Sequence, residues 1–473
     1  MSTSRHSWNC PPDPAGATAL GTASRAALLL PLLLAGCGGT ESSKPNVLMI
    51  VMDTVRADHL GCYGGPRVTP NLDDLAAAST RYETCTASSP WTVPSHGSLF
   101  TGRDPHTHGA HSFDLERFEG VDNVFTLLES EVTLAEILAT EGYATGGVVA
   151  NAAYLKPAFG LNQGFEDWVI SRMPAGDLNG RALEWIDSVD QGRPWFLFMN
   201  FMDAHRPYNV DPIEGEERIP QRESSTILLD QLYESVMVRG EQPGELGLKV
   251  REQYTRAIRN LDLALGELFS ALRDRELWDD TVVVVTSDHG EYFGEHGLVE
   301  HSKDVYEPAL DVPLLIKALG ENTGSVVTER TSNTHVPGLV IASIGGDVES
   351  RCGPQFPRLP GSPVMAENRY SRLRDLLHPE VGARFRRVRT AFYDDDWKLV
   401  RSSDGAHELY RLGLDPEEVE NLAEREPEIT ARMLELVEAH MASTPFEGNS
   451  REQVGGEDHL RDLQGTGYAG DDR

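Results

Sequence analysis

Carboxylate and imidazole side chains follow two long apolar runs in this sequence. Asp53 ends the run PNVLMIVMD, residues 45–53, and Asp288 and His289 follow TVVVVTS, residues 281–287. Continuous apolar runs rich in β-branched residues are typical of strands buried on both faces of a parallel sheet. Because the carboxyl ends of parallel strands meet at one edge, we expect these three side chains to face one crevice. Two carboxylates and an imidazole suit a divalent cation, although strand-end acids can instead cap neighbouring helices.

The stretch SSPWTVPSHGSLFTGR, residues 88–103, offers hydroxyl groups for nucleophilic chemistry. Pro94 ends an extended segment and Ser95 can cap a following helix, so Thr92 and Ser95 are predicted to lie at a helix N-terminus. Backbone N–H groups and the positive end of the helix dipole favour the ionised form of a hydroxyl placed there. Coordination to a metal lowers the pKa of a hydroxyl further. The two features together predict a metal-activated hydroxyl nucleophile.

The elements that must position these groups alternate between strand and helix. Besides 45–53 and 281–291, apolar strands are expected at 143–151 and 194–205, and each of them ends in Asn, Asp or His. Apolar residues spaced by three and four predict helices at 133–142, 180–189 and 254–277. This alternation predicts an α/β fold with a doubly wound, mostly parallel sheet flanked by helices.

The remaining segments define the expected domain organisation. Residues 45–375 form the predicted catalytic domain, in which the polar and acidic segment 210–253 is a surface insertion. Residues 376–443 form a small C-terminal α+β subdomain, with an antiparallel hairpin at 389–412 followed by one or two closing helices. Residues 444–473 lack apolar periodicity and are expected to be disordered.

The N-terminus indicates export. Arg25 precedes the apolar stretch AALLLPLLLA, which is too short to span a bilayer but suits a signal peptide. The run Leu34-Ala35-Gly36-Cys37 resembles the lipobox of bacterial lipoproteins, which implies a signal peptide at 1–36, a lipidated Cys37 and a linker at 37–44. The expected location is the cell envelope, with the catalytic domain in the periplasm or outside the cell. An ordinary secretory signal is the alternative.

Charge and cysteine content restrict the other possibilities. The chain contains 42 Lys and Arg against 74 Asp and Glu, a net charge of −32, and this balance argues against a nucleic-acid partner. Cys62, Cys85 and Cys352 remain in the exported part, at spacings that match no zinc motif. They permit one disulfide, and the sequence leaves its pairing open.

Four motifs together resemble the sulfatase family of the alkaline phosphatase superfamily. They are VMDTVRADHLGCYG, PSHGSLFTGRDPHTHG, TSDHGEYFGEHGL and ELYRLGLDPEEVENLA. They occur in the order and at the separations typical of that family, and the likeness covers residues 45 to 440. It implies the sulfatase fold, a bound metal and hydrolysis of a sulfate ester.

The resemblance includes two departures from the family pattern. Sulfatases carry Cys or Ser followed by x-Pro-x-Arg, and that Cys or Ser is oxidised to formylglycine, whereas this chain has Thr92 and His96. No formylglycine is expected, so Thr92 itself is implied as the nucleophile and His96 as a substrate-binding residue. Ser95 better suits the capping role. Thr54 replaces the second of two adjacent family acids, which favours manganese or zinc over calcium in a site formed by Asp53, Thr92, Asp288 and His289.

Two further histidines are implied to act in catalysis. His205 resembles the family histidine that protonates the leaving group, and His301 stands where sulfatases usually have a sulfate-binding lysine. An alternative grouping of Asp203, His205 and His301 would hold a second metal, as in two-zinc members of the superfamily.

The predicted activity is hydrolysis of a sulfate-type ester on a small molecule, glycan or lipid by metal-activated Thr92. Because a threonine sulfate cannot collapse as a formylglycine hemiacetal does, hydrolysis of a phosphodiester or phosphonate, or transfer of a phospho group, remains open. A Ser-His-Asp hydrolase and an inactive surface binding protein are rivals from other classes, although the chain lacks the G-x-S-x-G motif.

Overall fold

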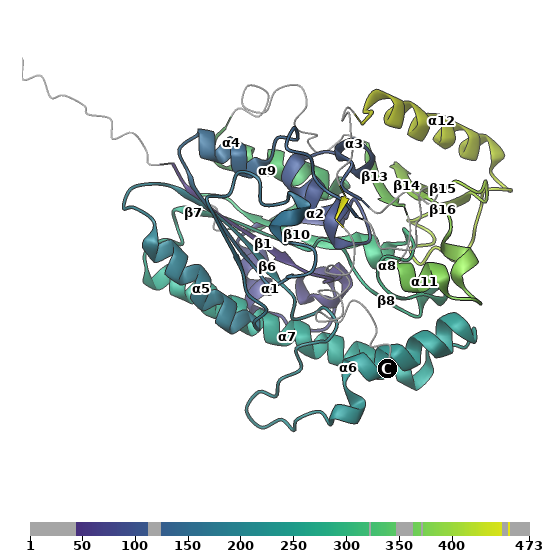
Figure 1. Cartoon of the computed structure of the whole chain (residues 1–473), viewed down its shortest axis with the longest axis horizontal. Coiled ribbons are helices and arrows are strands. Elements are labelled where there is room, and N and C mark those ends of the chain that lie inside the picture. Colours follow the sequence, from purple (N-terminus) through teal and green to yellow (C-terminus); the bar gives the residue numbers. More distant parts are fainter. Residues whose placement is uncertain are drawn as a thin grey trace, which may run out of the picture. The chain divides into compact units, whose positions relative to one another are not determined.

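A mixed, mostly parallel sheet forms the centre of the computed structural model (Figure 1). Among the described residues it has nine strands, in the order β11-β2-β10-β7-β1-β6-β4-β5, with β12 also paired to β2. Strand β1 (Asn46–Met52) pairs in parallel with β6 (Trp195–Phe201) and β7 (Thr281–Thr286). The predicted α/β class is confirmed.

The structure describes residues 44–111, 124–320, 323–346, 363–369, 372–446 and 453–454. The predicted signal peptide, Cys37 and most of the linker lie outside these residues, as does Cys352. Cys62 and Cys85 are free thiols, so they do not form the disulfide that the sequence permitted. No helix among the described residues is long and apolar enough to cross a membrane.

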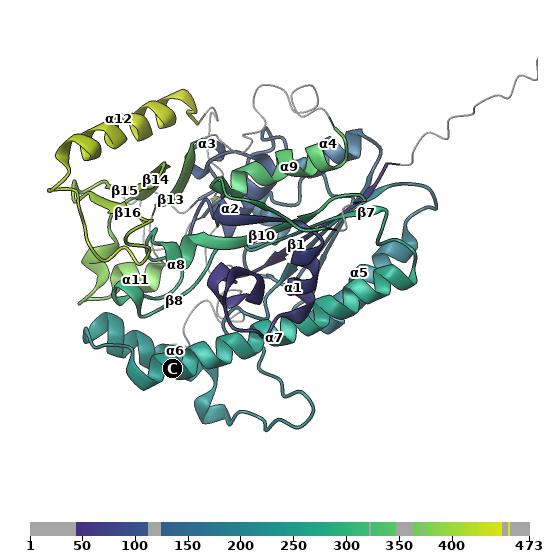
Figure 2. The same ribbon diagram turned by 180° about the vertical axis from the view of Figure 1, so that it is seen from behind.

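Helices cover both faces of the sheet, as Figures 1 and 2 show. Helices α1 (Pro70–Ala77), α5 (Ala175–Ser188) and α7 (Gly244–Asp274) pack together on one face. Helices α2 (Thr92–Thr101), α4 (Leu134–Thr140) and α9 (Val336–Ser343) cover the other. Strand β1 is fully buried between the two layers from Val47 to Met52, which explains its uninterrupted apolar sequence.

The remaining elements have the following bounds. The other strands of the large sheet are β2 (Thr80–Thr86), β4 (Ala144–Val149), β5 (Asp167–Ile170), β10 (Asp311–Lys317), β11 (Ser325–Val327) and β12 (Thr331–Ser332). Short pairs are formed by β8 (Tyr292–Phe293) with β9 (Val299–Glu300), and by β3 (Val124–Phe125) with β17 (Gln453–Val454). The other α-helices are α3 (Pro105–His108), α6 (Ser225–Leu232), α8 (Glu307–Leu310), α11 (Leu373–Leu377) and α12 (Pro427–Ser443).

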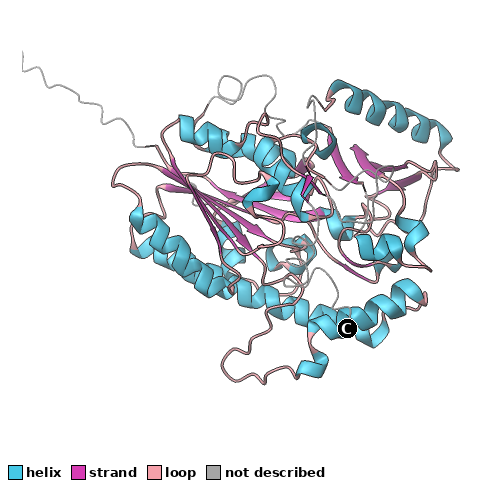
Figure 3. Ribbon diagram, viewed as in Figure 1, coloured by secondary structure: helices cyan, strands magenta, loops and turns pink. Residues whose placement is uncertain are grey.

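A second, antiparallel sheet lies toward the C-terminus, as Figure 3 shows. Its strands are β13 (Val364–Asn368), β14 (Arg389–Asp394), β15 (Trp397–Ser402) and β16 (Glu408–Arg411), paired in that order. Helix α12 packs on β14 and β15, and a small apolar core fills the space between them. The predicted hairpin is therefore part of a larger sheet. Since β13 precedes residue 375, this sheet begins earlier in the chain than the predicted domain boundary.

Two segments contain elements that the sequence analysis did not predict. The predicted insertion 210–253 contains α6, a π-helix at Tyr233–Val238 and the first residues of α7. Several of its few apolar side chains, Leu229 and Tyr233 among them, turn inward, so the overall polarity concealed a buried face. Within the tail expected to be disordered, Gln453 and Val454 form β17, which pairs with Phe125 and Val124.

Candidate active site

Three side chains from two strand ends converge beyond the carboxyl edge of the large sheet. Asp53, Asp288 and His289 each offer one ligand atom, and these three atoms lie within 4.8 Å of one another. His289 Nε2 is 3.4 Å from Asp288 Oδ2 and 4.0 Å from Asp53 Oδ1. All three side chains are fully buried. The structure thus brings together the residues that the sequence analysis placed in one crevice.

Neighbouring amides orient the carboxylate of Asp53. Its Oδ2 accepts hydrogen bonds from the side-chain amides of Asn151, at 3.0 Å, and Asn200, at 3.4 Å. Asn200 belongs to β6 and Asn151 follows β4, so two further strands of the sheet fix this carboxylate. Oδ1 is left facing the other two ligands. Partners of this kind are what hold a ligating carboxylate in one orientation.

Backbone groups orient Asp288 and His289 in the same way. Asp288 Oδ1 accepts from the backbone N–H of Thr54, at 3.2 Å, and of His289, at 3.0 Å. His289 Nδ1 lies 3.0 Å from the carbonyl oxygen of Gly290, and this contact requires the proton to be on Nδ1. The imidazole therefore presents the lone pair of Nε2, which is the form that binds a metal.

The atoms left over by these contacts fit a divalent cation. Asp53 Oδ1, Asp288 Oδ2 and His289 Nε2 are buried and have no hydrogen-bond partner within the described part of the chain. Burial raises the pKa of both carboxyls to about 7, and for Asp53 the nearby Asp288 adds to the effect. Burial lowers the pKa of His289. Orphaned buried acceptors are rare in folded proteins, and two oxygens with one nitrogen make a ligand set for a borderline ion.

Thr54 has a strained backbone that serves this arrangement. Its φ is +64°, a left-handed conformation that β-branched residues rarely adopt. The hydroxyl of Thr54 donates to the carbonyl of Ala204 at 2.9 Å, and Tyr254 donates to the carbonyl of Thr54 at 2.6 Å. These contacts hold the turn after β1 so that the Thr54 N–H reaches Asp288. A threonine here orients a ligand through its backbone.

Helix α2 starts at Thr92 and is fastened to the same residue, Asp288. The hydroxyl of Ser95 donates to the main-chain oxygen of Asp288 at 2.6 Å, and His96 Nδ1 lies 3.6 Å from Asp288 Oδ2. Contrary to the prediction, Ser95 therefore does not cap the helix; Thr92 is its first residue and Trp91 its N-cap. The contacts of Ser95 and His96 bring the first turn of α2, which carries the buried Thr92, to the metal ligands.

His96 is a neutral ring in an apolar environment. Its Nδ1 donates to the carbonyl of Thr92 at 2.9 Å, and its ring packs edge-on against Phe100 and Phe198. Burial lowers its pKa to about 3, and this outweighs the favourable hydrogen bond to Thr92. Its contacts fix the first turn of α2, and the substrate-binding role of His96 stays a prediction.

His205 and His301 lie next to the metal ligands. The ring of His301 is centred 4.6 Å from that of His289 and 5.1 Å from that of His205. Glu300 and Ser302 have φ values of +64° and +63°, so the chain turns sharply on both sides of His301. His205 Nδ1 lies 2.7 Å from the carbonyl of Arg206, which places its proton on Nδ1. Burial lowers the pKa of His205 to about 3.

A cation that the sequence analysis did not identify contacts His301. Arg372 Nη2 lies 2.5 Å from His301 Nε2. Since a guanidinium has donors only, Nε2 must accept and the proton of His301 must be on Nδ1, which lies 3.4 Å from the carboxylate of Glu291. Arg372 stands outside every recognisable motif and is separated from His301 by 71 positions. Tertiary packing alone brings the two together.

The site groups three of the four motifs that carry the family resemblance, namely those that contain Asp53, Ser95 and Asp288. The sulfatase family profile matches residues 45–340, which include the three candidate metal ligands and Thr92. The chain belongs to the sulfatase family.

Curated relatives of this sulfatase-family chain act on sulfate esters, as their names state. It is 30% identical to N-acetylgalactosamine-6-sulfatase of Sus scrofa over 58% of this chain and 55% of that protein. It is 24% identical to arylsulfatase K of Canis lupus familiaris over 84% of this chain and 82% of that protein. The chain thus spans only a little over half the length of the first relative.

Solved structures share the fold. The phosphonate monoester hydrolase of Agrobacterium radiobacter superposes with a TM-score of 0.65 at 19% identity, over 85% of this chain and 96% of that one. A protein solved in complex with its substrate D-glucosamine-2-N,6-O-disulfate superposes with a TM-score of 0.63 at 17% identity, over 85% and 98% of the two chains. At this level of identity the likeness establishes the sulfatase fold.

The alternative two-metal grouping is not formed by this sulfatase-family chain. The carboxylate of Asp203 accepts from Asn209 Nδ2 at 2.7 Å and from the backbone N–H of Ala175 at 3.2 Å. Across the described ranges, the one group of three or more acidic, His or Cys side chains spaced to hold an ion is Asp53, Asp288 and His289.

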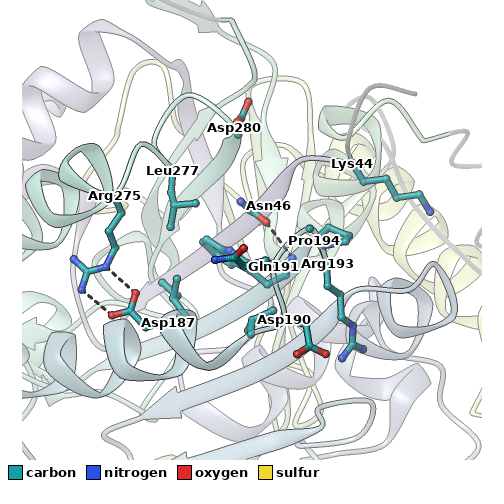
Figure 4. Close-up of a pocket in the computed structure, with 14 residues that line it drawn as sticks. Lys44, Asn46, Asp187, Asp190, Gln191, Arg193, Pro194, Arg275, Leu277 and Asp280 are labelled. Carbon is teal, nitrogen blue, oxygen red and sulfur yellow. Dashed lines mark hydrogen bonds and ion pairs between the residues drawn. The ribbon is translucent and has the colours of Figure 1, made fainter. Parts of the chain in front are cut away.

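A separate pocket lies at the opposite edge of the sheet. It has a volume of about 430 Å³, and Asn46 and Trp195, the first residues of β1 and β6, are among its lining residues. Two of its residues, Arg275 and Asp187, pair with each other at 3.0 Å (Figure 4). It contains none of the catalytic candidates, in accordance with the rule that ligands of open α/β sheets bind beyond the carboxyl ends of the strands.

Proposed function

We propose that this protein is a metal-dependent hydrolase of sulfate-type esters in which Thr92 is the nucleophile. The proposal rests on three ligand atoms, one each from Asp53, Asp288 and His289, that lie close together and have no hydrogen-bond partner among the described residues. Ser95 connects this group to the first turn of α2. Manganese or zinc suits this set better than calcium, which prefers six to eight oxygen ligands. We further propose that Thr92 completes the coordination.

When bound, the cation supplies positive charge that favours ionisation of a nearby hydroxyl and stabilises anionic ester oxygens. The residues of the chain do the remaining work. Thr92 Oγ1 attacks sulfur, a bond from Oγ1 to sulfur forms, and the bond from sulfur to the leaving oxygen breaks. The N-terminus of α2 favours the developing negative charge, since its first N–H groups have no partners within the helix.

His205 is the better of the two histidines for proton transfer. At neutral pH its Nε2 is unprotonated, so it can accept the proton of Thr92 and return it to the leaving oxygen. The corresponding nitrogen of His301 already accepts from Arg372. In the second step water attacks sulfur and passes a proton to His205, and the bond from sulfur to Thr92 Oγ1 breaks. His205 returns the proton to Oγ1, which restores the Thr92 hydroxyl as sulfate leaves.

The unmodified threonine favours a second candidate. A threonine sulfate must be released by a second displacement at sulfur, because it lacks the hemiacetal exit of formylglycine enzymes. The same displacement at phosphorus is the usual course of covalent phosphoryl transfer, so hydrolysis of a phosphodiester or phosphonate, or transfer to an alcohol, is supported by the same residues.

A substrate panel tests the proposal. Purified protein is assayed with aryl sulfate, phosphate monoester, phosphate diester and phosphonate, each with manganese, zinc or calcium, and again after chelation. We expect turnover of at least one ester that is lost on chelation. Activity that persists without metal would indicate a Ser-His-Asp hydrolase instead. No turnover above that of Thr92→Ala on any ester would support the binding-protein alternative.

We also propose that the mature protein is exported and anchored through a lipid on Cys37. The proposal rests on residues 25–37 of the sequence. Metabolic labelling with a fatty acid tests it, since Cys37→Ala should abolish incorporation and release the protein from membranes.

A further inference from the structure

The proposed site has a deficit of positive charge for an anionic substrate. A divalent cation is balanced by the carboxylates of Asp53 and Asp288. The nearby imidazoles offer little to such an anion, because His289 directs Nε2 toward the two carboxylates and His301 accepts from Arg372 through its Nε2. A sulfate or phosphate ester adds at least one negative charge, and burying an unpaired charge is costly. Another cation is therefore required.

Arg372 is a cation in contact with the imidazole cluster. Its Nη2 is 2.5 Å from His301 Nε2, and its Nη1 is 3.6 Å from Glu300 Oε2. Its side chain is 14% exposed, so its charge is only weakly screened. The ring of His301, which Arg372 contacts, is centred 4.6 Å from the ring of His289 and 5.1 Å from that of His205.

The ion pairs that connect Arg372 to its neighbours carry a positive excess. Glu300 is shared between Arg372 and Arg206, and Asp230 is shared between Arg206 and Arg374. Within this chain of ion pairs between described residues, three guanidinium groups share two carboxylates. An additional negative charge next to Arg372 would therefore join a network in which the described guanidinium groups outnumber the described carboxylates.

The backbone that carries Arg372 is held firmly in place. Asp375 is fully buried, accepts from Tyr233 Oη at 2.9 Å and forms an ion pair with Lys303. The guanidinium of Arg374 lies over the ring of Tyr233, 4.3 Å from its centre. These contacts tie the start of α11 to the π-helix and to the turn after His301, so Arg372 is directed at the site by a rigid support.

We infer that Arg372 is the residue of this chain that binds the non-bridging oxygens of the ester, with His301 holding its guanidinium ready. An anionic oxygen is a stronger acceptor than a neutral imidazole, and a guanidinium can bind two such oxygens side by side. On substrate binding the guanidinium exchanges the His301 contact for the ester. This inference rests on the proposed function and assigns to it a fixed positive charge.

The test compares Arg372→Gln and Arg372→Lys with Arg239→Gln, which removes an exposed arginine next to the π-helix. For Arg372→Gln we expect kcat/KM and the affinity for inorganic sulfate and phosphate each to fall about 100-fold, with the melting temperature nearly unchanged. Arg372→Lys should be intermediate, since it keeps the charge and loses the paired donors. Arg239→Gln should match the wild type.

Two further comparisons complete the test. The first distinguishes anion binding by Arg372 from a role in positioning His301, and the second separates a failure of this inference from a failure of the proposed function. If Arg372 only positions His301, then His301→Gln and Arg372→Gln will reduce kcat/KM equally and leave inorganic anion binding intact, which would overturn the inference. If the wild type hydrolyses no ester, the proposed function fails, but calorimetric titration with sulfate and phosphate still decides the role of Arg372. That role is overturned if the folded Arg372→Gln protein binds both anions as the wild type does, or if the wild type binds neither.

Discussion

His289 Nε2 and Asp53 Oδ1 face each other at 4.0 Å, although they follow strands from distant parts of the sequence. Parallel pairing of β1 with β7 brings the two side chains together. The other nitrogen of His289 contacts the carbonyl of Gly290, and the other oxygen of Asp53 accepts from Asn151, so one ligand atom of each side chain stays available. The sheet and its amides therefore position the candidate ligands of the proposed cation.

Cation affinity should fall steeply below neutral pH. The carboxyls of Asp53 and Asp288 have pKa values raised to about 7 in the metal-free protein, and a cation binds only their ionised forms. Protons therefore compete with the cation as the pH falls through 7. If both carboxyls are protonated, the affinity for the cation falls by up to about 100-fold per pH unit. Competition titration with zinc or manganese measures the affinity at pH 6 and pH 8, which lie roughly one unit either side of these pKa values. Equal affinity at both pH values would contradict it.

Thr92→Ala should reduce kcat by at least about 1,000-fold, because the covalent step is lost, while Thr92→Ser should retain measurable turnover. Rapid quenching followed by mass spectrometry should find one sulfuryl or phosphoryl group on Thr92 of the wild type. Ser95→Ala is the control for the identity of the nucleophile, because Ser95 is the other hydroxyl in this turn and its Oγ donates to the main-chain oxygen of Asp288. A label found on Ser95 would reassign the nucleophile.

His205→Gln should slow hydrolysis about 100- to 10,000-fold for esters with poor leaving groups. The loss should be much smaller for nitrophenyl esters, whose leaving oxygen needs no proton. The ratio of kcat/KM between the two substrate types, measured for wild type and variant, checks this. A uniform loss for both types would indicate that His205 has a structural role.

Asp375→Asn should destabilise the fold by about 3 kcal/mol, because it removes the charged partner of the buried Lys303 ammonium. Asp187→Asn removes the partner of Arg275 from an exposed ion pair and should cost less than about 1 kcal/mol. Urea unfolding of the two variants gives both values. Similar values would mean that the Lys303 pair is not effectively desolvated.

The ion pair of His106 with Glu367, at 2.6 Å, should make stability depend on pH. Burial opposes both charges, but the mutual attraction prevails, raising the pKa of His106 above 6.5 and lowering that of Glu367 from 4.5 to about 2. The histidine's contribution is complete below pH 6.5 and is lost as the pH rises through the raised value. The glutamate's contribution is complete above pH 4.5 and is lost as the pH falls toward 2.

Both contributions are therefore present between pH 4.5 and 6.5. His106→Gln should reduce the free energy of unfolding by about 1 to 3 kcal/mol in this range and by less at alkaline pH. Denaturant titrations of wild type and variant across the range test this. A pH-independent difference would mean that the pair does not ionise as described.

The sequence was sufficient to predict the α/β class and the convergence of Asp53, Asp288 and His289, because both follow from local patterns. An apolar run that ends in Asp or Asp-His is visible without any knowledge of pairing, and the geometry of parallel sheets does the rest. The start of α2 was predicted incorrectly, because Pro94 was interpreted as a terminator. In the structure it occupies the first turn, where the missing N–H has no consequence.

Arg372 and the π-helix at Tyr233–Val238 could not be predicted in the same way. Arg372 lies in a short segment without periodicity, and its position depends on the contact between Asp375 and Lys303, which are separated by 72 positions. The acidic composition of residues 210–253 concealed a helix whose buried face has few members. Such features depend on which surfaces meet after folding, and no local pattern records that.

Strand β13 and helix α11 lie in the C-terminal third of the chain, beyond the part that matches the family profile, yet Arg372 at the start of α11 contacts His301. Under the inferred role of Arg372, the proposed reacting groups and the anion-binding group are encoded in different parts of one gene product. We then expect that exchanging the C-terminal third between homologues alters which anion is selected and leaves the reacting atoms in place.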